Sequence, residues 1–282
     1  MSKMFRNGVL AGCAMLVLTS AAFAQEEEEK KKESWLPGGL AGNVAYATDY
    51  SFRGISQTQR DMAFSGGLDW NHDSGIHLGL WSSSIKFRTA AGVPENVDPD
   101  GDGSPNNPNG QAEIDKSYLE QDFYGGFTHS FDAFSFDILG VYYFYPMDDK
   151  YNYGEGILNL SYDFGITKLM LQGVGSNDYF GYASVGGYVN GGLNTPLPLD
   201  IPYFDVSLES RVGYTTTNQP IYFNAKNGKG EQDYVDQTIA LIFALPFNMT
   251  LDFRYVGTNI KTSEYGNADA GDRFVFAAKY AF

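Results

Sequence analysis

The end of the chain alternates between two kinds of side chain. The even positions of 274–282 carry Phe, Phe, Ala, Tyr and Phe, whereas the odd positions include the cations Arg273 and Lys279. A period of two residues is typical of a β-strand, because successive side chains point to opposite faces. About ten residues of tilted strand are enough to cross the core of a bilayer. The pattern predicts a strand with one face in an apolar medium and the other in a polar one.

The same alternation recurs from Leu40 onward and predicts about twelve strands. We place them at 43–54, 62–72, from Ile76 onward, 119–130, 133–145, 155–164, 166–175, 182–191, 203–216, 234–245, 247–259 and 272–282. Short connections (72–75, 131–133, 165, 195–202 and 246) alternate with longer ones (87–117, 146–154, 217–233 and 260–271). Two connections at the end with the longer loops, 57–61 and 177–179, are exceptions because they are short. A β-sandwich is the alternative, but it does not require the long connections to share one end. We therefore expect an all-β fold, a transmembrane antiparallel β-barrel with short periplasmic turns and longer extracellular loops.

Composition agrees with this class. The chain has 282 residues, a net charge of −15 and a slightly negative mean hydropathy of −0.28. After the first 24 residues no apolar run approaches the roughly 18 residues of a membrane helix, whereas the two faces of a barrel average to neutral hydropathy. The acidic balance also argues against a nucleic-acid partner.

The amino-terminal segment has the pattern of an export signal. Residues 1–24 combine Lys3 and Arg6, an apolar stretch and a small-x-small cleavage site at 22–24. A lipid anchor on Cys13 is the alternative, but the apolar core continues well past that residue. Residues 25–40 form a charged periplasmic segment, a solvated tether or a docking segment, and 41–282 would be the barrel. The predicted location is the cell outer membrane.

Three stretches near the start resemble a known family. They are 43–58 (NVAYATDYSFRGISQT), 66–75 (GGLDWNHDSG) and 79–83 (GLWSS). Together with the last strand, they are similar to the TorF family of outer-membrane porins. The resemblance implies a barrel and a pore, and it supplies no substrate and no catalytic residue.

The polar face of each predicted strand supplies the candidate pore-lining residues. They are Asp49, Arg53, Asp69, Asp122, Asp137, Glu155, Glu209, Arg211, Asp236, Asp252, Arg254, Arg273 and Lys279. Acids exceed bases among the inward residues, so the sequence predicts a narrow channel for passive diffusion of small hydrophilic solutes, with a mild cation preference. The alternative is a closed structural or surface-interaction barrel whose interior charges pair with one another. Asp49/Arg53, Glu209/Arg211 and Asp252/Arg254 are the candidate charge ladders.

One loop carries a possible calcium motif. Asp98, Asp100 and Asp102 stand at positions one, three and five, followed by Gly103 and Ser104. Asn109 stands at position twelve, where an acid is expected, so an ordinary Pro/Gly/Asn-rich surface loop is the alternative. No other cofactor is expected, and calcium at Asp98, Asp100, Asp102 and Ser104 is a hypothesis.

The remaining expectations concern activity and partners. His72, His77 and His129 are the three histidines, and all fall near the periplasmic end, away from the outer rim where a lipid or peptide substrate would arrive. We therefore expect no enzymatic activity. The expected partners are outer-membrane lipid, small hydrophilic solutes or ions, and the barrel assembly machinery, which would read the last strand through Phe282.

Overall fold

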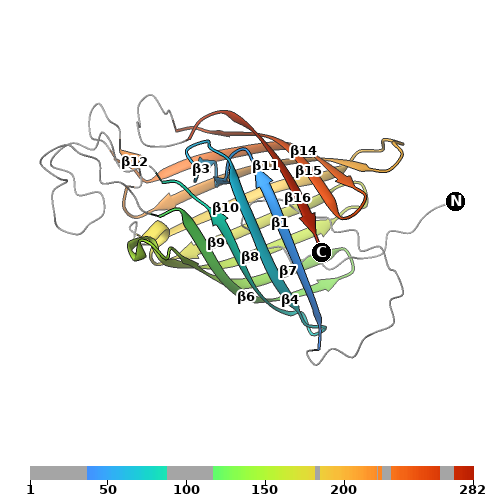
Figure 1. Ribbon diagram of the computed structural model, residues 1–282, viewed down its shortest axis with the longest axis horizontal. Helices are drawn as coiled ribbons and strands as arrows, with labels where there is room; N and C mark the ends of the chain where they lie inside the picture. The colour runs from blue at the N-terminus through green and yellow to red at the C-terminus, as the bar shows by residue number, and fades with distance from the viewer. Residues whose placement is uncertain (1–36, 88–116, 182–184, 221, 224–229, 261–269) are drawn as a thin grey trace, which may run out of the picture.

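The computed structural model describes residues 37–87, 117–181, 185–220, 222–223, 230–260 and 270–282. Twelve of its strands close into one antiparallel barrel in which each strand pairs with its neighbours along the chain (Figure 1). They are β1 (Gly39–Ala47), β4 (Ala63–Asn71), β5 (Ile76–Ser84), β6 (Leu119–Phe131), β7 (Phe134–Phe144), β8 (Tyr153–Asp163), β9 (Lys168–Ser176), β10 (Gly186–Pro196), β11 (Asp205–Thr217), β14 (Asp233–Leu245), β15 (Met249–Thr258) and β16 (Arg273–Ala281). The predicted fold class and strand number are confirmed.

The first and last strands close the barrel. Val44 of β1 lies opposite Tyr280 of β16, and on its other side opposite Gly66 of β4. The last residue continues this pairing, because Phe282 and Gly42 exchange two backbone hydrogen bonds of 2.8 and 2.9 Å. Closure leaves no unpaired strand edge, which is what a sheet in an apolar medium requires.

The outer face of the barrel is apolar on every side. Exposed examples are Phe64 on β4, Leu78 on β5, Ile138 on β7, Ile239 on β14 and Phe274 on β16, which is 84% exposed. A continuous apolar belt of this extent is far larger than a water-soluble monomer exposes. The apolar residues of the alternating pattern therefore form the outer belt, and such a belt suits contact with acyl chains.

The two ends of the barrel differ in their connections. One end carries short turns, such as 72–75 between β4 and β5, and the last residue; the other carries the long connections (Figure 1). The described helices are two single turns at the long-connection end, η1 (Asp149–Tyr151) and η2 (Tyr179–Gly181). None of the helices in the described ranges is long and apolar enough to cross a membrane.

The largest departure from the predicted strands is at the first one. It was expected to run from 43 to 54, but β1 ends at Ala47, and the connection to β4 spans 48–62 rather than 57–61. This connection holds a small hairpin, β2 (Ser51–Phe52) and β3 (Ile55–Ser56), whose turn has positive φ angles at Arg53 (47°) and Gly54 (82°). Only glycine adopts this backbone region freely, so the Arg-Gly pair marks a turn.

Beyond the end of β1, the alternation of aromatic residues does not reflect contact with lipid. Tyr50 and Phe52 stand on the apolar face of the strand predicted at 43–54, the face expected to meet lipid. They are instead 1% and 6% exposed and lie inside the barrel in an apolar cluster with Trp81 and Tyr143. The hairpin has folded inward, so its apolar face meets the interior instead of lipid.

Candidate functional site

The inward-folded hairpin, residues 49–58, is held inside the barrel by two buried ion pairs. Arg273 of β16 donates to Asp49 through Nε. Arg53 meets Glu155 of β8 in a two-pronged contact, with N–O distances of 2.8 and 2.7 Å, and their side chains are 6% and 0% exposed. Bidentate guanidinium–carboxylate contacts are strong and directional. The hairpin is therefore joined to opposite sides of the wall.

Aromatic residues complete the environment of Arg53. Its guanidinium carbon lies 4.4 Å from the centroid of the Phe52 ring and 4.8 Å from that of Tyr188. Arg53 also donates to the Tyr179 hydroxyl, and Tyr234 donates to the Arg53 carbonyl at 2.9 Å. Contacts of a cation with aromatic faces gain strength where water is excluded, so this arginine is fixed on every side.

Burial affects the acidity of the Tyr179 phenol in this cluster. Loss of solvent raises its pKa to about 12, against the opposing influence of the Arg53 charge. Tyr179 lies in η2, outside the barrel strands. With its pKa raised in this way, the phenol stays protonated through the whole physiological range.

One half of the interior is aromatic and closely packed. Tyr50 and Tyr145 both donate to Glu120, at 2.7 and 2.6 Å, and Tyr143 donates to Glu155 at 2.8 Å. A cluster of buried apolar residues from β5 to β10 surrounds these phenols. Strands β5 to β10 therefore carry much of the apolar filling of the barrel.

Polar side chains from five strands form a hydrogen-bonded belt that runs from β5 to β10. His77 of β5 contacts Asp137 of β7 at 2.8 Å, and Asn159 of β8 donates to Asp137 at 3.2 Å. Gln172 of β9 donates to Asn159, and Asn190 of β10 donates to Gln172, each at 2.9 Å. We call these five residues the polar belt.

The belt passes over β6 because that strand has a glycine there. A Cβ atom at Gly126 would lie 2.8 Å from His77 Nε2 and 2.6 Å from the Leu139 Cβ. Such contacts are too short for any side chain, so glycine lets His77 reach Asp137 across the intervening strand.

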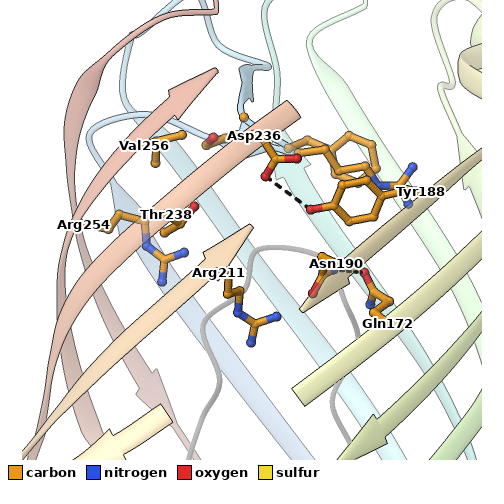
Figure 2. A pocket seen from close by; sticks show the side chains of 12 residues that line it. Gln172, Tyr188, Asn190, Arg211, Asp236, Thr238, Arg254 and Val256 are labelled. Atoms are coloured by element: carbon orange, nitrogen blue, oxygen red, sulfur yellow. Dashed lines mark hydrogen bonds between the residues drawn. The ribbon is translucent and has the colours of Figure 1, made fainter. Parts of the chain in front are cut away.

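The belt ends at a cavity beneath the hairpin (Figure 2). The cavity opens to solvent, and the space free of protein atoms in it and at its opening is about 550 Å³. Residues 51–54 of the hairpin cover it, and its other lining residues are Gln172, Tyr188, Asn190, Arg211, Asp236, Thr238, Arg254 and Val256. It therefore combines guanidinium, carboxylate and amide groups with one phenol.

The structure places the predicted pore-lining residues inside the barrel. Asp122, Asp137, Glu155, Glu209, Asp236, Asp252, Arg254 and Arg273 are buried on inward positions of their strands, and Asp69, Arg211 and Lys279 are partly buried on such positions. Asp49 and Arg53 also lie inside, but on the hairpin rather than on a strand. That these residues line a conducting pore stays a prediction.

Two of the three predicted charge ladders are ion pairs. Glu209 and Arg211 approach to 3.2 Å, and Arg254 donates to Asp252 at 2.9 Å. The pairing of Asp49 with Arg53 was wrong. The inward fold turns these two residues to different walls, where Arg273 and Glu155 are their partners.

Sequence reasoning missed part of the site. Glu120 has the same strand phase as Asp122, and Asn190 the same phase as Tyr188, so inward positions were readable from the alternation. Tyr50 and Phe52 could not be placed in this way, because they lie outside any barrel strand.

The other predicted site residues remain untested. The calcium motif, Asp98 to Asn109, lies outside the described residues. Within the described ranges, no group of three or more His, Cys, Asp or Glu side chains is arranged to hold a metal ion. His72 and His129 lie at the short-turn end of β4 and β6, while His77 belongs to the polar belt.

Sequence comparison decides the family. The model for a family described as "Bacterial protein of unknown function (Gcw_chp)" matches residues 31–282. The chain belongs to the Gcw_chp family. No curated protein matches. The sequence resemblance led us to expect the TorF family. The matching family model has a different name, so membership of the TorF family is not shown.

Solved structures similar to this Gcw_chp chain include two porins. The KdgM porin in complex with disordered oligogalacturonate is 8% identical, with a TM-score of 0.49, covering 86% of this chain and 99% of that one. The NanC porin is 9% identical, with a TM-score of 0.47 and coverage of 86% and 98%. LpxR from Salmonella typhimurium is 7% identical, with a TM-score of 0.42 and coverage of 86% and 99%.

Proposed function

We propose that this Gcw_chp protein is an outer-membrane channel for passive diffusion of small hydrophilic solutes and ions, with a mild cation preference. The observation that carries the proposal is the charged interior of a closed barrel whose exterior is apolar. Burying ionic groups in a barrel costs several kcal/mol per ion unless water or a counter-ion accompanies them. Asp122 and Asp236 form no ion pair with a described residue, and an interior path for water and ions accounts for these two uncompensated charges.

The sign of the interior charge supports the preference for cations. Below the rims of the barrel, nine described carboxylates face six described Lys or Arg side chains. The carboxylates are Asp49, Asp69, Glu120, Asp122, Asp137, Glu155, Glu209, Asp236 and Asp252, and the bases are Arg53, Lys168, Arg211, Arg254, Arg273 and Lys279. Rings of acidic side chains favour cations in channels by the same electrostatic attraction.

Planar-bilayer recording tests both parts of the proposal. We expect discrete conductance steps from the purified protein and, in a gradient of potassium chloride, a reversal potential of the sign set by potassium. A reversal potential of the chloride sign would refute the cation preference, and a folded protein without conductance would refute the channel.

The alternative is a closed barrel that acts as a structural or surface module. The observation in its favour is the aromatic packing around the hairpin, where Tyr50, Tyr143 and Tyr179 are at most 1% exposed. An intact fold without conductance in the recordings above would support it.

The location and the remaining partners follow from the proposed channel. An outer-membrane barrel contacts lipid through its apolar belt, and the barrel assembly machinery would recognise the final strand through Phe282, which is 60% exposed. Calcium binding by the loop of Asp98 stays a prediction, tested by calorimetric titration with millimolar calcium.

A further inference from the structure

The cavity end of the polar belt presents a free acceptor. A carboxylate only accepts hydrogen bonds, so Asp137 obliges Asn159 to turn its NH₂ group toward it. The Asn159 oxygen then accepts from Gln172, and the Gln172 oxygen accepts from Asn190. Each amide is oriented by the one before it, and the last oxygen, Oδ1 of Asn190, is turned away from Gln172 (Figure 2).

This last oxygen accepts no hydrogen bond from the described residues, although Asn190 is only 7% exposed. The same holds for Oδ2 of Asp236, a residue that lines the same cavity and is 5% exposed. Buried polar atoms are rarely left without a partner, since desolvation is costly. Both atoms are acceptors, so the group that completes them is a hydrogen-bond donor or a cation.

Asp236 has room for its carboxylate because two neighbours are glycines. A Cβ atom at Gly213 would lie 2.5 Å from Asp236 Oδ2, and one at Gly54 would lie 2.7 Å from the Asp236 Cβ. The other oxygen, Oδ1, accepts from the Tyr188 hydroxyl at 3.3 Å, a neutral donor. No Lys or Arg in the described ranges forms an ion pair with Asp236.

The three guanidinium groups of the cavity do not compensate the negative charge of Asp236, because each is paired with another carboxylate. Arg53 is paired with Glu155, Arg254 with Asp252 and Arg211 with Glu209. Three cations therefore face four carboxylates, counting Asp236, and one negative charge is left over at the cavity.

We propose that the cavity binds a small primary ammonium ion, whose positive charge compensates Asp236 and whose N–H groups donate to Asp236 and Asn190. This inference rests on the proposed cation-preferring channel, for which the cavity would be a binding site along the path. In the described ranges no group of three or more His, Cys, Asp or Glu side chains is arranged to hold a metal ion, and a neutral polyol would leave the carboxylate charge uncompensated.

Calorimetric titration of the full folded protein in detergent tests the site, with methylammonium chloride as the probe. We expect saturable binding of methylammonium at millimolar concentration, and none of tetramethylammonium, which has the same charge but no donor. Asp236→Asn should weaken methylammonium binding at least tenfold, about 1.4 kcal/mol. Asn190→Val should weaken it several-fold.

Asp205→Asn is the matched control, because it makes the same change at an exposed residue of β11 and should leave binding unchanged. Equal binding of tetramethylammonium, undiminished binding to the Asp236→Asn variant, or binding of sorbitol in place of methylammonium would overturn the inference. Conductance is recorded separately on the same sample. Binding without conductance would refute only the channel, and conductance without binding would refute only this site.

Discussion

Breaking the contact between Arg53 and Glu155 should release the hairpin from the interior of the barrel. Glu155→Gln keeps the shape of the side chain and removes its charge, so Arg53 is left with one amide oxygen in place of a bidentate carboxylate. Removing one partner of a buried ion pair costs about 3–5 kcal/mol, and these two side chains are 6% and 0% exposed. The lower value applies because the Gln oxygen still accepts one hydrogen bond.

A cost of about 3 kcal/mol changes the ratio of released to docked hairpin by roughly two powers of ten, at about 1.4 kcal/mol per power. The readout is a thiol on the hairpin. Ile55 is 7% exposed and belongs to a buried cluster with Tyr179 and Tyr234, so Ile55→Cys, in a chain with Cys13 replaced by Ser, reports whether the hairpin is docked. Glu155→Gln should raise its rate of reaction with a charged thiol reagent about a hundredfold.

Single-channel conductance should rise in the same variant, because the released hairpin no longer occupies the mouth of the barrel. Asp163→Asn is the matched control, since Asp163 is exposed at the opposite end. If the Glu155→Gln protein keeps the barrel fold and shows neither faster labelling nor greater conductance, the ion pair does not hold the hairpin and the reasoning is refuted.

Two further predictions concern the stability of the interior. Gly126→Val places atoms against His77 and Leu139, and overpacking of this kind costs about 1–3 kcal/mol. Urea unfolding should show this loss of stability. An unchanged midpoint would mean that β6 has room for a side chain at this position. Tyr179→Phe tests the raised pKa of the phenol. The stabilisation by protonated Tyr179 is fully present below the pKa of a free tyrosine, near 10, and is lost as the pH rises through the pKa in the folded protein, about 12. The native protein should therefore lose roughly 2–3 kcal/mol relative to Tyr179→Phe between about pH 9 and 12. The other tyrosines titrate in both proteins, so a constant difference across this range would contradict the shift.

The sequence by itself determined the barrel. Alternation with a period of two residues assigns each side chain to one face, and this local rule needs no knowledge of distant contacts. It placed Asp122, Asp236 and Arg254 on inward faces, and it put Phe274 and Tyr280 outside. Residues two apart on one strand, such as Asp252 and Arg254, are neighbours by the same rule, which is why that pairing was readable.

The tertiary structure alone decided where the hairpin lies and which charges meet across the interior. Nothing in residues 48–62 distinguishes a loop that extends into solvent from one that turns into the barrel, because the outcome depends on the partners. Arg273 is 224 positions from Asp49, and Glu155 is 102 from Arg53. The polar belt likewise depends on Gly126 being level with His77, which strand register sets and periodicity does not reveal. Pairing along one strand is local, whereas the filling of a closed barrel is a property of all its walls together.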